Sequence, residues 1–246
     1  MRVALLSEEG IGEVAYAPTP TDPADAVAFI ASHAPAERAI GGIAAILDAE
    51  GGIENSTNIQ SWIGYTFGKE LAERIKGEVT VVNDTEIAAL GEAVYGAGRD
   101  FFSIAYIGIG TGVGTAHVAD KKVMPGTSKG VERMGIITLE DGTTLEERIG
   151  GRSLLKTHGM PAKELPAAVW SELTPLLAEG VYNAFSRWEP DAVILGGSLI
   201  NEENGFKVEE VARTAHDTFE TPLRVFHATL GSVSGLWGAK ALASGY

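Results

Sequence analysis

Apolar and polar residues along this chain follow two repeats, the alternation or short apolar run of a β-strand and the longer spacing of an amphipathic helix. Apolar runs predict strands at residues 2–6, 11–16, 39–46, 79–82, 102–109, 113–119, 121–124, 191–195 and 223–228. Helical spacing predicts helices at residues 24–33, 66–75, 83–96, 145–149, 166–188, 208–219 and 234–244. Residues 48–59 and 126–151 are otherwise loop-like, and Pro175 is a candidate break in the longest helix.

Turn and cap residues sharpen several of these elements. A Ser-Glu-Glu-Gly sequence between the first two strands predicts a hairpin turn. Asp22 followed by Pro23 has the form of an N-cap with proline in the first helical position. Asn83, with Glu86 three residues later, has the form of a capping box, and Gly96 is placed to end that helix.

The order of the elements defines the fold class. Strands, a helix, a strand and a helix are followed by a second series of strands and helices, which favours an α/β protein of two lobes with mixed sheets over one doubly wound sheet. The polar segment 96–100 is the natural division. We therefore expect a smaller lobe at 1–98 and a larger one at 99–233, with the terminal helix, 234–246, a candidate addition to the first.

Composition narrows the class of protein. The 246 residues are 45% hydrophobic and 21% charged, which suits a globular chain with a sizeable core. A net charge of −14 without a basic cluster disfavours nucleic-acid binding. Cysteine is absent, which excludes disulfides and cysteine-ligated metal. No apolar run reaches the roughly 20 residues of a membrane span, and acidic residues interrupt the N-terminal segment early, so we expect a soluble cytoplasmic protein.

A glycine-rich loop joins two predicted strands, with glycine at positions 108, 110, 112 and 114. The loop is no dinucleotide fingerprint, because position 113 is valine and a strand follows, and it lacks the Gly-Lys-Ser/Thr of a Walker loop. Its backbone N–H groups and the Thr111 hydroxyl could face an anion. A hairpin that is merely tight explains the glycines equally well.

Asp84 lies at the junction between a predicted strand and a helix. Asn and Asp at such junctions are most often helix caps. Asn83 could supply the cap alone, which would leave the Asp84 carboxylate free to act as a general base. Both roles stay open on these residues alone.

Four segments, at 81–98, 107–126, 189–200 and 235–243, resemble in order and spacing those of the ROK family of sugar kinases. The resemblance covers nearly the whole chain. It implies the actin-like, ribonuclease-H-like fold of two lobes, with ATP and a sugar bound between them.

The resemblance also assigns roles to individual residues. Asp84 corresponds to the catalytic base, and Asn83 to a neighbouring sugar ligand. Glu146 corresponds to a sugar-binding glutamate, and Asn58 with Trp62 to a further segment at the sugar. The residues that match the family's phosphate and nucleotide motifs are Gly110, Thr111, Gly112, Gly196 and Gly197.

The activity that the resemblance implies is phosphoryl transfer from ATP, with Mg²⁺, to a hexose hydroxyl. The resemblance does not identify which sugar is the substrate, or whether ATP or polyphosphate is the phosphoryl donor. The family also suggests a homodimer. A transcriptional repressor is disfavoured, because no helix-turn-helix segment precedes the kinase-like part and the charge is strongly acidic.

The chain departs from the family pattern in four places. The family opens on a strand ending in Asp-x-Gly-Gly-Thr-Lys, whereas this chain begins with the stretch that normally follows; a loss of that strand and a late start both explain this. The Glu-x-Gly-His motif falls on residues 133–136, with Glu132 one position out of register. The zinc-binding cysteines are missing, so no zinc is expected, and Ala44-Ala45-Ile46 replaces Pro-Gly-Pro. These departures keep open an alternative function, a non-catalytic sugar- or nucleotide-binding protein on the kinase scaffold.

Overall fold

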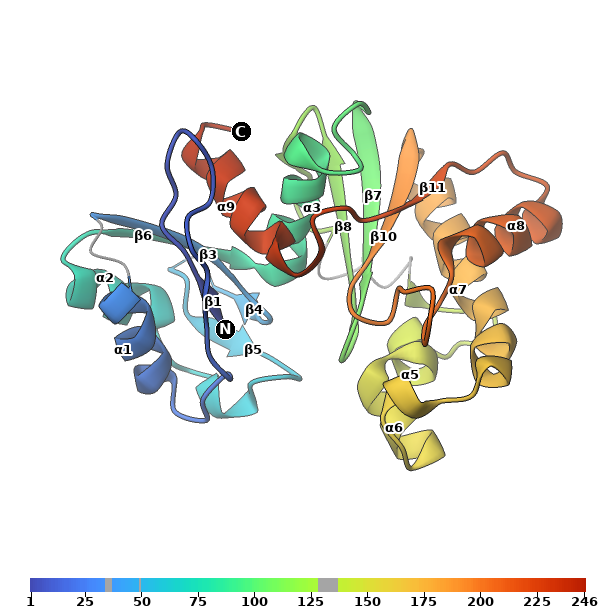
Figure 1. Cartoon of the computed structure of the whole chain (residues 1–246), viewed down its shortest axis with the longest axis horizontal. Helices are drawn as coiled ribbons and strands as arrows, with labels where there is room; N and C mark the ends of the chain where they lie inside the picture. Colours follow the sequence, from blue (N-terminus) through green and yellow to red (C-terminus); the bar gives the residue numbers. More distant parts are fainter. Residues whose placement is uncertain (34–36, 49, 128–136) are drawn as a thin grey trace. The chain divides into compact units, whose positions relative to one another are not determined.

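The computed structural model describes residues 1–33, 37–48, 50–127 and 137–246 (Figure 1). Its contacts divide the chain into two compact units, Met1–Gly91 with Val233–Tyr246 as unit 1, and Glu92–Ser232 as unit 2. The chain first crosses from unit 1 to unit 2 after Gly91, inside helix α3 (Asp84–Tyr95). The lobe limits 1–98 and 99–233 stay a prediction, because compactness alone does not show which segments fold or move as a body.

Unit 1 begins with a hairpin. Strands β1 (Arg2–Val3) and β2 (Ala15–Tyr16) pair antiparallel, and a bridge between Leu6 and Ile11 continues the ladder toward the turn. The predicted hairpin is therefore confirmed, although its regular strands are shorter than predicted. The other elements of unit 1 are α1 (Pro23–His33), β3 (Arg38–Ile43), β4 (Ile46–Leu47), β5 (Ile53–Asn55), η1 (Gln60–Trp62), α2 (Phe67–Ile75), β6 (Glu78–Asn83), the first part of α3, and α9 (Ser234–Ala243).

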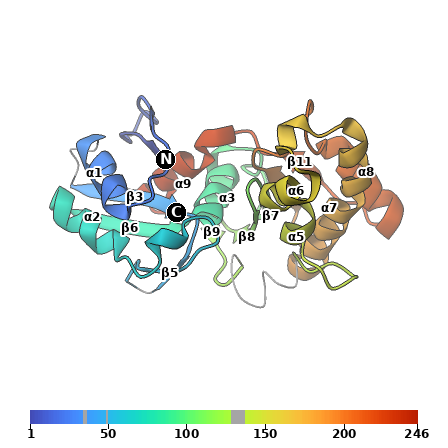
Figure 2. The ribbon, with the colours of Figure 1, turned by 90° about the horizontal axis from the view of Figure 1, so that it is seen from below.

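The core of unit 1 lies around a parallel pair of strands. β3 pairs with β6 in a register that sets Ile43 opposite Asn83. Helices α1 and α2 pack side by side, as Figures 1 and 2 show, and α9 packs against β3. The buried cluster consists of Ala26, Val27, Ile43, Ala45, Ile53, Trp62, Phe67 and Leu71. The amphipathic spacing that predicts α1 and α2 thus supplies the apolar faces that cover this pair of strands.

The prediction for residues 39–59 needs two corrections. The single strand predicted at 39–46 ends at Ile43, because the N–H of Ala45 bonds back to the carbonyl of Ile43 at 2.8 Å and turns the chain. The segment 48–59, predicted as a loop, contains β5, which pairs antiparallel with β4. A three-residue strand is too short to show a repeat in the sequence, so only its partner reveals it.

Unit 2 is built on a five-stranded sheet in the order β11-β10-β7-β8-β9. β7 (Ser103–Ile109), β8 (Val113–Ala119) and β9 (Lys122–Val123) are antiparallel neighbours. β10 (Ala192–Gly196) and β11 (Val225–His227) run parallel to β7. Figure 1 shows the strands side by side, and the mixed sheet agrees with the predicted fold class.

The helices of unit 2 cover one face of this sheet. They are α5 (Leu145–Ile149), α6 (Gly151–His158), α7 (Ala167–Trp188) and α8 (Val208–Phe219), with η2 (Ala162–Glu164) between them and η3 (Gly231–Val233) at the end of the unit. Ala105, Ile107 and Ile109 alternate along β7 and are fully buried with side chains of α5, α7 and α8. This period of two is the strand signal that the sequence carries.

Two predictions in unit 2 are corrected. α7 runs unbroken through Pro175, because the buried residues around it, among them Thr174, Leu177 and Val181, hold the helix against the core. α6 has no counterpart among the predicted helices, since its eight residues are mostly polar and only Leu154 is buried. No helix in the described part of the chain is long and apolar enough to cross a membrane.

Candidate active site

Asn83 ends β6 and caps α3. Its Oδ1 accepts hydrogen bonds from the N–H groups of Thr85 at 2.9 Å and Glu86 at 3.3 Å, as an N-cap does. Its Nδ2 donates to the carbonyl of Ala45 at 3.2 Å, in the turn that follows β3. The predicted cap is confirmed, and the side chain is fixed at the carboxyl ends of the two parallel strands of unit 1.

Asp84 is therefore not needed as the cap. The residue as a whole is exposed, and its carboxylate has one weak side-chain contact, from the Thr85 hydroxyl at 3.4 Å. Withdrawal from solvent nevertheless raises the pKa of Asp84, and the bonds from Thr85 only oppose this shift. A carboxylate without a capping role and with a raised pKa is suited to accept a proton.

The segment that contains Asn58 is held at the same turn. The Ser56 hydroxyl donates to the carbonyl of Ala44 at 2.7 Å and accepts from the N–H groups of Asn58 and Ile59, both at 3.1 Å. The structure thus brings the Asn83 and Asn58 segments to one turn at 44–45. Ser56 was missed in the sequence analysis. It is buried in the structure, but residue spacing in a polar loop does not distinguish a buried serine from an exposed one.

Trp62 belongs to the core of unit 1. It is 3% exposed, its indole N–H donates to the carbonyl of Pro20 at 3.1 Å, and its ring stacks on Phe67 with centroids 5.4 Å apart. Its place next to the Asn58 segment is structural, because both the polar tip and the ring have partners inside the protein.

The glycine loop of unit 2 is fixed through its carbonyl groups. The carbonyl of Gly110 accepts from the N–H of Gly151 at 2.8 Å, and that of Thr111 from Arg152 at 3.0 Å. In the part of the chain that the structure describes, the N–H groups of Thr111 and Gly112 have no partner. The loop therefore keeps two backbone N–H groups that could donate to an anion.

Gly151 and Arg152 are further residues that the sequence did not single out for this loop. The signal that could have found them is Gly150-Gly151 after the short predicted helix, because a glycine pair there predicts a turn and a new helix start. The sequence alone does not predict that these two residues bond to the glycine loop, because the tertiary fold brings the two segments together.

Glu146 contacts the glycine loop directly. Its Oε2 accepts from the N–H of Val113 at 3.0 Å. A Cβ on Gly112 would lie 2.4 Å from the same oxygen, so the carboxylate can occupy this position only because residue 112 is glycine. The structure thus gives Glu146 a bracing role that the sequence did not predict, while its role toward a sugar stays a prediction.

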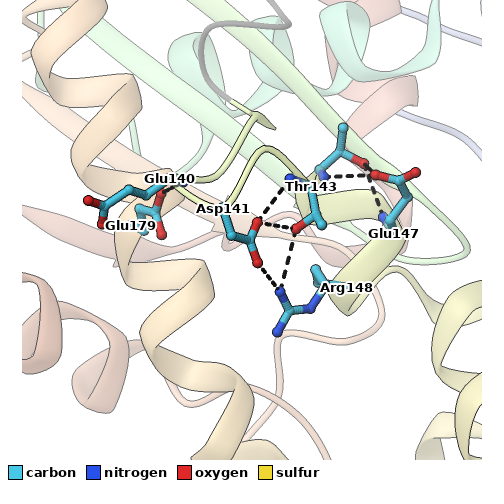
Figure 3. A network of polar contacts seen from close by, with 7 residues as sticks. Glu140, Asp141, Thr143, Glu147, Arg148 and Glu179 are labelled. Carbon is cyan, nitrogen blue, oxygen red and sulfur yellow. Dashed lines mark hydrogen bonds and ion pairs between the residues drawn. The ribbon is translucent and has the colours of Figure 1, made fainter.

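A polar network fixes the start of α5 and hence Glu146 (Figure 3). Thr144 and Glu147 form a complete capping box. Asp141 accepts from the N–H of Thr143 at 2.9 Å, from its hydroxyl at 2.5 Å and from Arg148 at 2.6 Å. These bonds lower the pKa of Asp141, the Thr143 hydroxyl first, and the N–H of Thr144 is the first cause that lowers the pKa of Glu147.

We expect Thr144→Ala to lower stability by about 1 kcal/mol, because the hydroxyl that accepts from the N–H of Glu147 and donates to the Glu147 carboxylate is lost. For a chain of this length that corresponds to a decrease in Tm of roughly 2–4 °C. Differential scanning calorimetry measures it. The matched control is Thr66→Ala, since Thr66 is the N-cap of α2 and its side chain makes no cap bond. Equal losses in the two variants would contradict the role of the network.

The Gly196-Gly197 turn lies against the glycine loop. β10 and β7 are parallel neighbours, with Gly196 opposite Gly108. A Cβ on Gly197 would lie 2.2 Å from the carbonyl oxygen of Ile109, and the N–H of Leu199 donates to that oxygen at 3.0 Å. The carboxyl ends of adjacent parallel strands are where α/β sheets bind ligands.

The structure thus gathers the predicted phosphate residues and Glu146 at one end of the unit 2 sheet, while Asn58, Asn83 and Asp84 gather in unit 1.

The model of the ROK family matches residues 24–151 and 141–245. The chain belongs to the ROK family. Among curated proteins it is 26% identical to a fructokinase from Pediococcus pentosaceus over 214 residues, 80% of this chain and 74% of that one. The sequence-based resemblance is thereby confirmed.

Solved structures of ROK proteins share the fold of this chain. A ROK hexokinase from Thermus thermophilus matches with a TM-score of 0.76 at 23% identity, over 94% of this chain and 90% of that one. A ROK glucokinase from Streptomyces griseus, in complex with glucose and AMPPNP, matches with a TM-score of 0.76 at 22% identity, over 97% and 94%. The predicted actin-like α/β fold is confirmed over nearly the whole chain.

The aligned Glu-x-Gly-His segment, residues 133–136 with Glu132, lies outside the described residues. Within the described ranges, no group of three His, Asp or Glu side chains could hold a metal ion. The Asp141 carboxylate is bonded to the backbone of Thr143 and to Arg148.

Proposed function

We propose that this protein is an ATP-dependent sugar kinase that transfers a phosphoryl group to a hexose hydroxyl. The observation that carries the proposal is Asp84, a carboxylate released from capping by Asn83 and raised in pKa, at the start of α3. Membership of the ROK family and the similarity to a fructokinase support the choice of substrate class. The choice of ATP rests on the AMPPNP bound to the related glucokinase.

Asp84 acts as the general base. Its carboxylate accepts the proton of the sugar hydroxyl as that oxygen attacks the γ-phosphorus, and the bond from phosphorus to the bridging oxygen of ADP breaks. The protein forms no covalent bond to the phosphoryl group. Alignment of the two reactants supplies most of the acceleration.

The glycine loop holds the donor phosphates. The N–H groups of Thr111 and Gly112 and the Thr111 hydroxyl donate to phosphate oxygens, and the turn at Gly196 and Gly197 borders the same end of the sheet. Mg²⁺ neutralises phosphate charge in such reactions. Mg²⁺ in such sites is bound largely through the substrate phosphates and water.

Asn83 and Asn58 bind the sugar from the turn at 44–45, and Glu146 is the third expected ligand. Amide and carboxylate side chains suit hydroxyl groups, since they accept and donate in fixed directions. The homodimer and the cytoplasmic location stay predictions.

Sugar-dependent release of ADP, measured with a panel of hexoses and amino sugars, tests the proposal. Turnover with at least one hexose is expected, and the panel identifies which. Calorimetric binding of sugar and of Mg·ATP without any transfer would instead support the non-catalytic alternative.

We expect Gly112→Ala to raise the KM for ATP about tenfold and to raise the KM for sugar as well, because Glu146 is an expected sugar ligand. The new Cβ would lie 2.4 Å from Glu146 Oε2, so the carboxylate must move and release the N–H of Val113 that it holds in the loop. A phosphate bond weakened in the loosened loop corresponds to about 1.5–3 kcal/mol. Steady-state kinetics with each substrate varied measures it. Gly235→Ala is the control, since its Cβ would make only an ordinary contact at 3.6 Å. An unchanged KM for ATP would contradict the phosphate role of the loop.

A further inference from the structure

Glu92 is a fully buried carboxylate in α3 to which neither the sequence nor the proposed reaction gives a role. Its Oε2 accepts from the N–H groups of Ala97 at 3.0 Å and Thr229 at 3.1 Å, and its Oε1 from the N–H of Leu230 at 2.9 Å. The Thr229 hydroxyl adds a weaker contact at 3.4 Å. Every partner of Glu92 is a hydrogen-bond donor, so this position requires a side chain with two acceptor oxygens.

The chain around Glu92 is shaped to admit this carboxylate. A Cβ on Gly96 would lie 2.0 Å from Glu92 Oε2, so only glycine leaves room for it. The ammonium group of Lys121 closes the end of α3 by donating to the carbonyls of Ala93 at 2.6 Å and Arg99 at 2.7 Å. The C-terminal turn of α3 is therefore held on two sides.

Glu92 joins segments that are far apart in sequence. It lies eight residues after Asp84 on the same helix, which is about two turns. Its partners Thr229 and Leu230 lead through η3 into α9, 137 and 138 residues later. The carboxylate thus fastens α3 to the chain that precedes α9.

α9 also contacts α3 further toward its start. A Cβ on Gly238 would lie 1.7 Å from the carbonyl oxygen of Ile87, and one on Gly91 would lie 2.3 Å from that of Ser234. The two helix backbones therefore touch at these glycines. α3 is one continuous helix from Asp84 to Tyr95, so Glu92 and Ile87 lie on the same element as Asp84.

We propose that Glu92 is a positioning residue for phosphoryl transfer, which holds α3 so that Asp84 reaches the sugar hydroxyl in line. This inference rests on the proposed function. Burying a charge is costly because water is removed from it, and apolar residues of similar volume often stabilise a core better. The directional bonds to 229 and 230 are what an apolar side chain could not supply.

Two variants test this from different sides. Glu92→Gln places an NH₂ group against N–H donors, and Gly96→Ala displaces the carboxylate without changing it. Each should lower kcat by about 10- to 100-fold, the scale of a misplacement near 1 Å, with both KM values within about twofold of the wild type. The double variant should lose little more than either single one, because both break the same contact.

Thr174→Val is the matched control. It removes a buried hydroxyl that bonds to the carbonyl of Trp170 within α7, so it should lower Tm and leave kcat unchanged at temperatures below the transition. A Glu92 or Gly96 variant that behaves like this control would overturn the inference, because its role would then be stability alone.

Hydrogen exchange separates failure of this inference from failure of the proposed function. In both variants the amides of 84–88 should exchange about tenfold faster or more, together with those of 229 and 230, whatever the reaction. Unchanged protection at 84–88 would overturn the inference even if the protein is a kinase. Absence of turnover in the wild type would refute the kinase proposal and with it the role in phosphoryl transfer, and the exchange result would then decide only whether Glu92 holds the start of α3. If Glu92→Gln does not fold, the Gly96→Ala variant carries both measurements.

Discussion

Asp84→Asn should lower kcat by about 10²- to 10⁴-fold, the contribution of a positioned general base. The amide keeps the shape of the side chain and cannot accept the proton. The helix cap is supplied by Asn83, so the start of α3 should be unaffected. We therefore expect the KM values and the hydrogen-exchange pattern to stay close to those of the wild type. Turnover unchanged in this variant would exclude Asp84 as the base.

The raised pKa of Asp84 has two further consequences for the same experiment. The base must be ionised, so kcat/KM of the wild type for sugar should fall as pH decreases through that pKa, at a higher pH than an ordinary aspartate would give. A carboxyl with a raised pKa in the folded state adds stability only in its protonated form, and that stability is lost as pH rises through the folded pKa. At neutral pH the ionised group therefore opposes folding, and Asp84→Asn should have an equal or higher Tm.

Asp25→Asn is the matched control for Asp84→Asn. Asp25 lies in the first turn of α1, so the substitution removes a carboxylate from a comparable helix position. It should leave kcat and its pH dependence unchanged. A lower Tm in Asp84→Asn, with activity lost in proportion, would contradict the base and indicate a structural role instead.

Local signals predicted the part of the site that depends on neighbours in sequence. Asn83 caps α3 because its side chain reaches the N–H groups two and three residues later, and this geometry needs only the strand-to-helix junction. The alternation of β7 and the spacing of α8 are likewise properties of one element. The turn at 44–45 could not be predicted, since its carbonyls are bonded by Ser56 and Asn83 from other segments.

The remaining interactions of the site depend on residues distant in sequence. Glu146 reaches the N–H of Val113, 33 residues away, and no repeat in the chain connects them. Glu92 is one charged residue on a helix and has no sequence feature that distinguishes a buried carboxylate from an exposed one. The glycines of the phosphate motifs were predicted as ligand-binding positions, but the structure adds a packing reason for Gly112 and Gly197.

Gly197→Ala should cost more than about 3 kcal/mol of stability, or roughly 6–12 °C in Tm. The backbone there has a φ of +92°, which disfavours alanine, and the new Cβ would lie 2.2 Å from the carbonyl oxygen of Ile109. That atom belongs to the backbone at the end of β7, so it cannot move aside without separating the Gly197 turn from the glycine loop. Folded protein should also bind ATP more weakly, because the donors at Thr111 and Gly112 shift with the loop.

Gly159→Ala separates the two causes of the stability loss expected in Gly197→Ala, the positive φ and the steric contact with Ile109. Gly159 ends α6 with a φ of +71°, and a Cβ there would meet no atom within 4 Å. Its replacement should cost only the conformational part, about 1 kcal/mol. Calorimetric Tm values and ATP titrations of both variants measure the difference. If Gly197→Ala is no less stable than Gly159→Ala but has lost ATP binding, the glycine serves the ligand alone. If it loses both, close packing of the β10 turn on β7 is what forms the donor site.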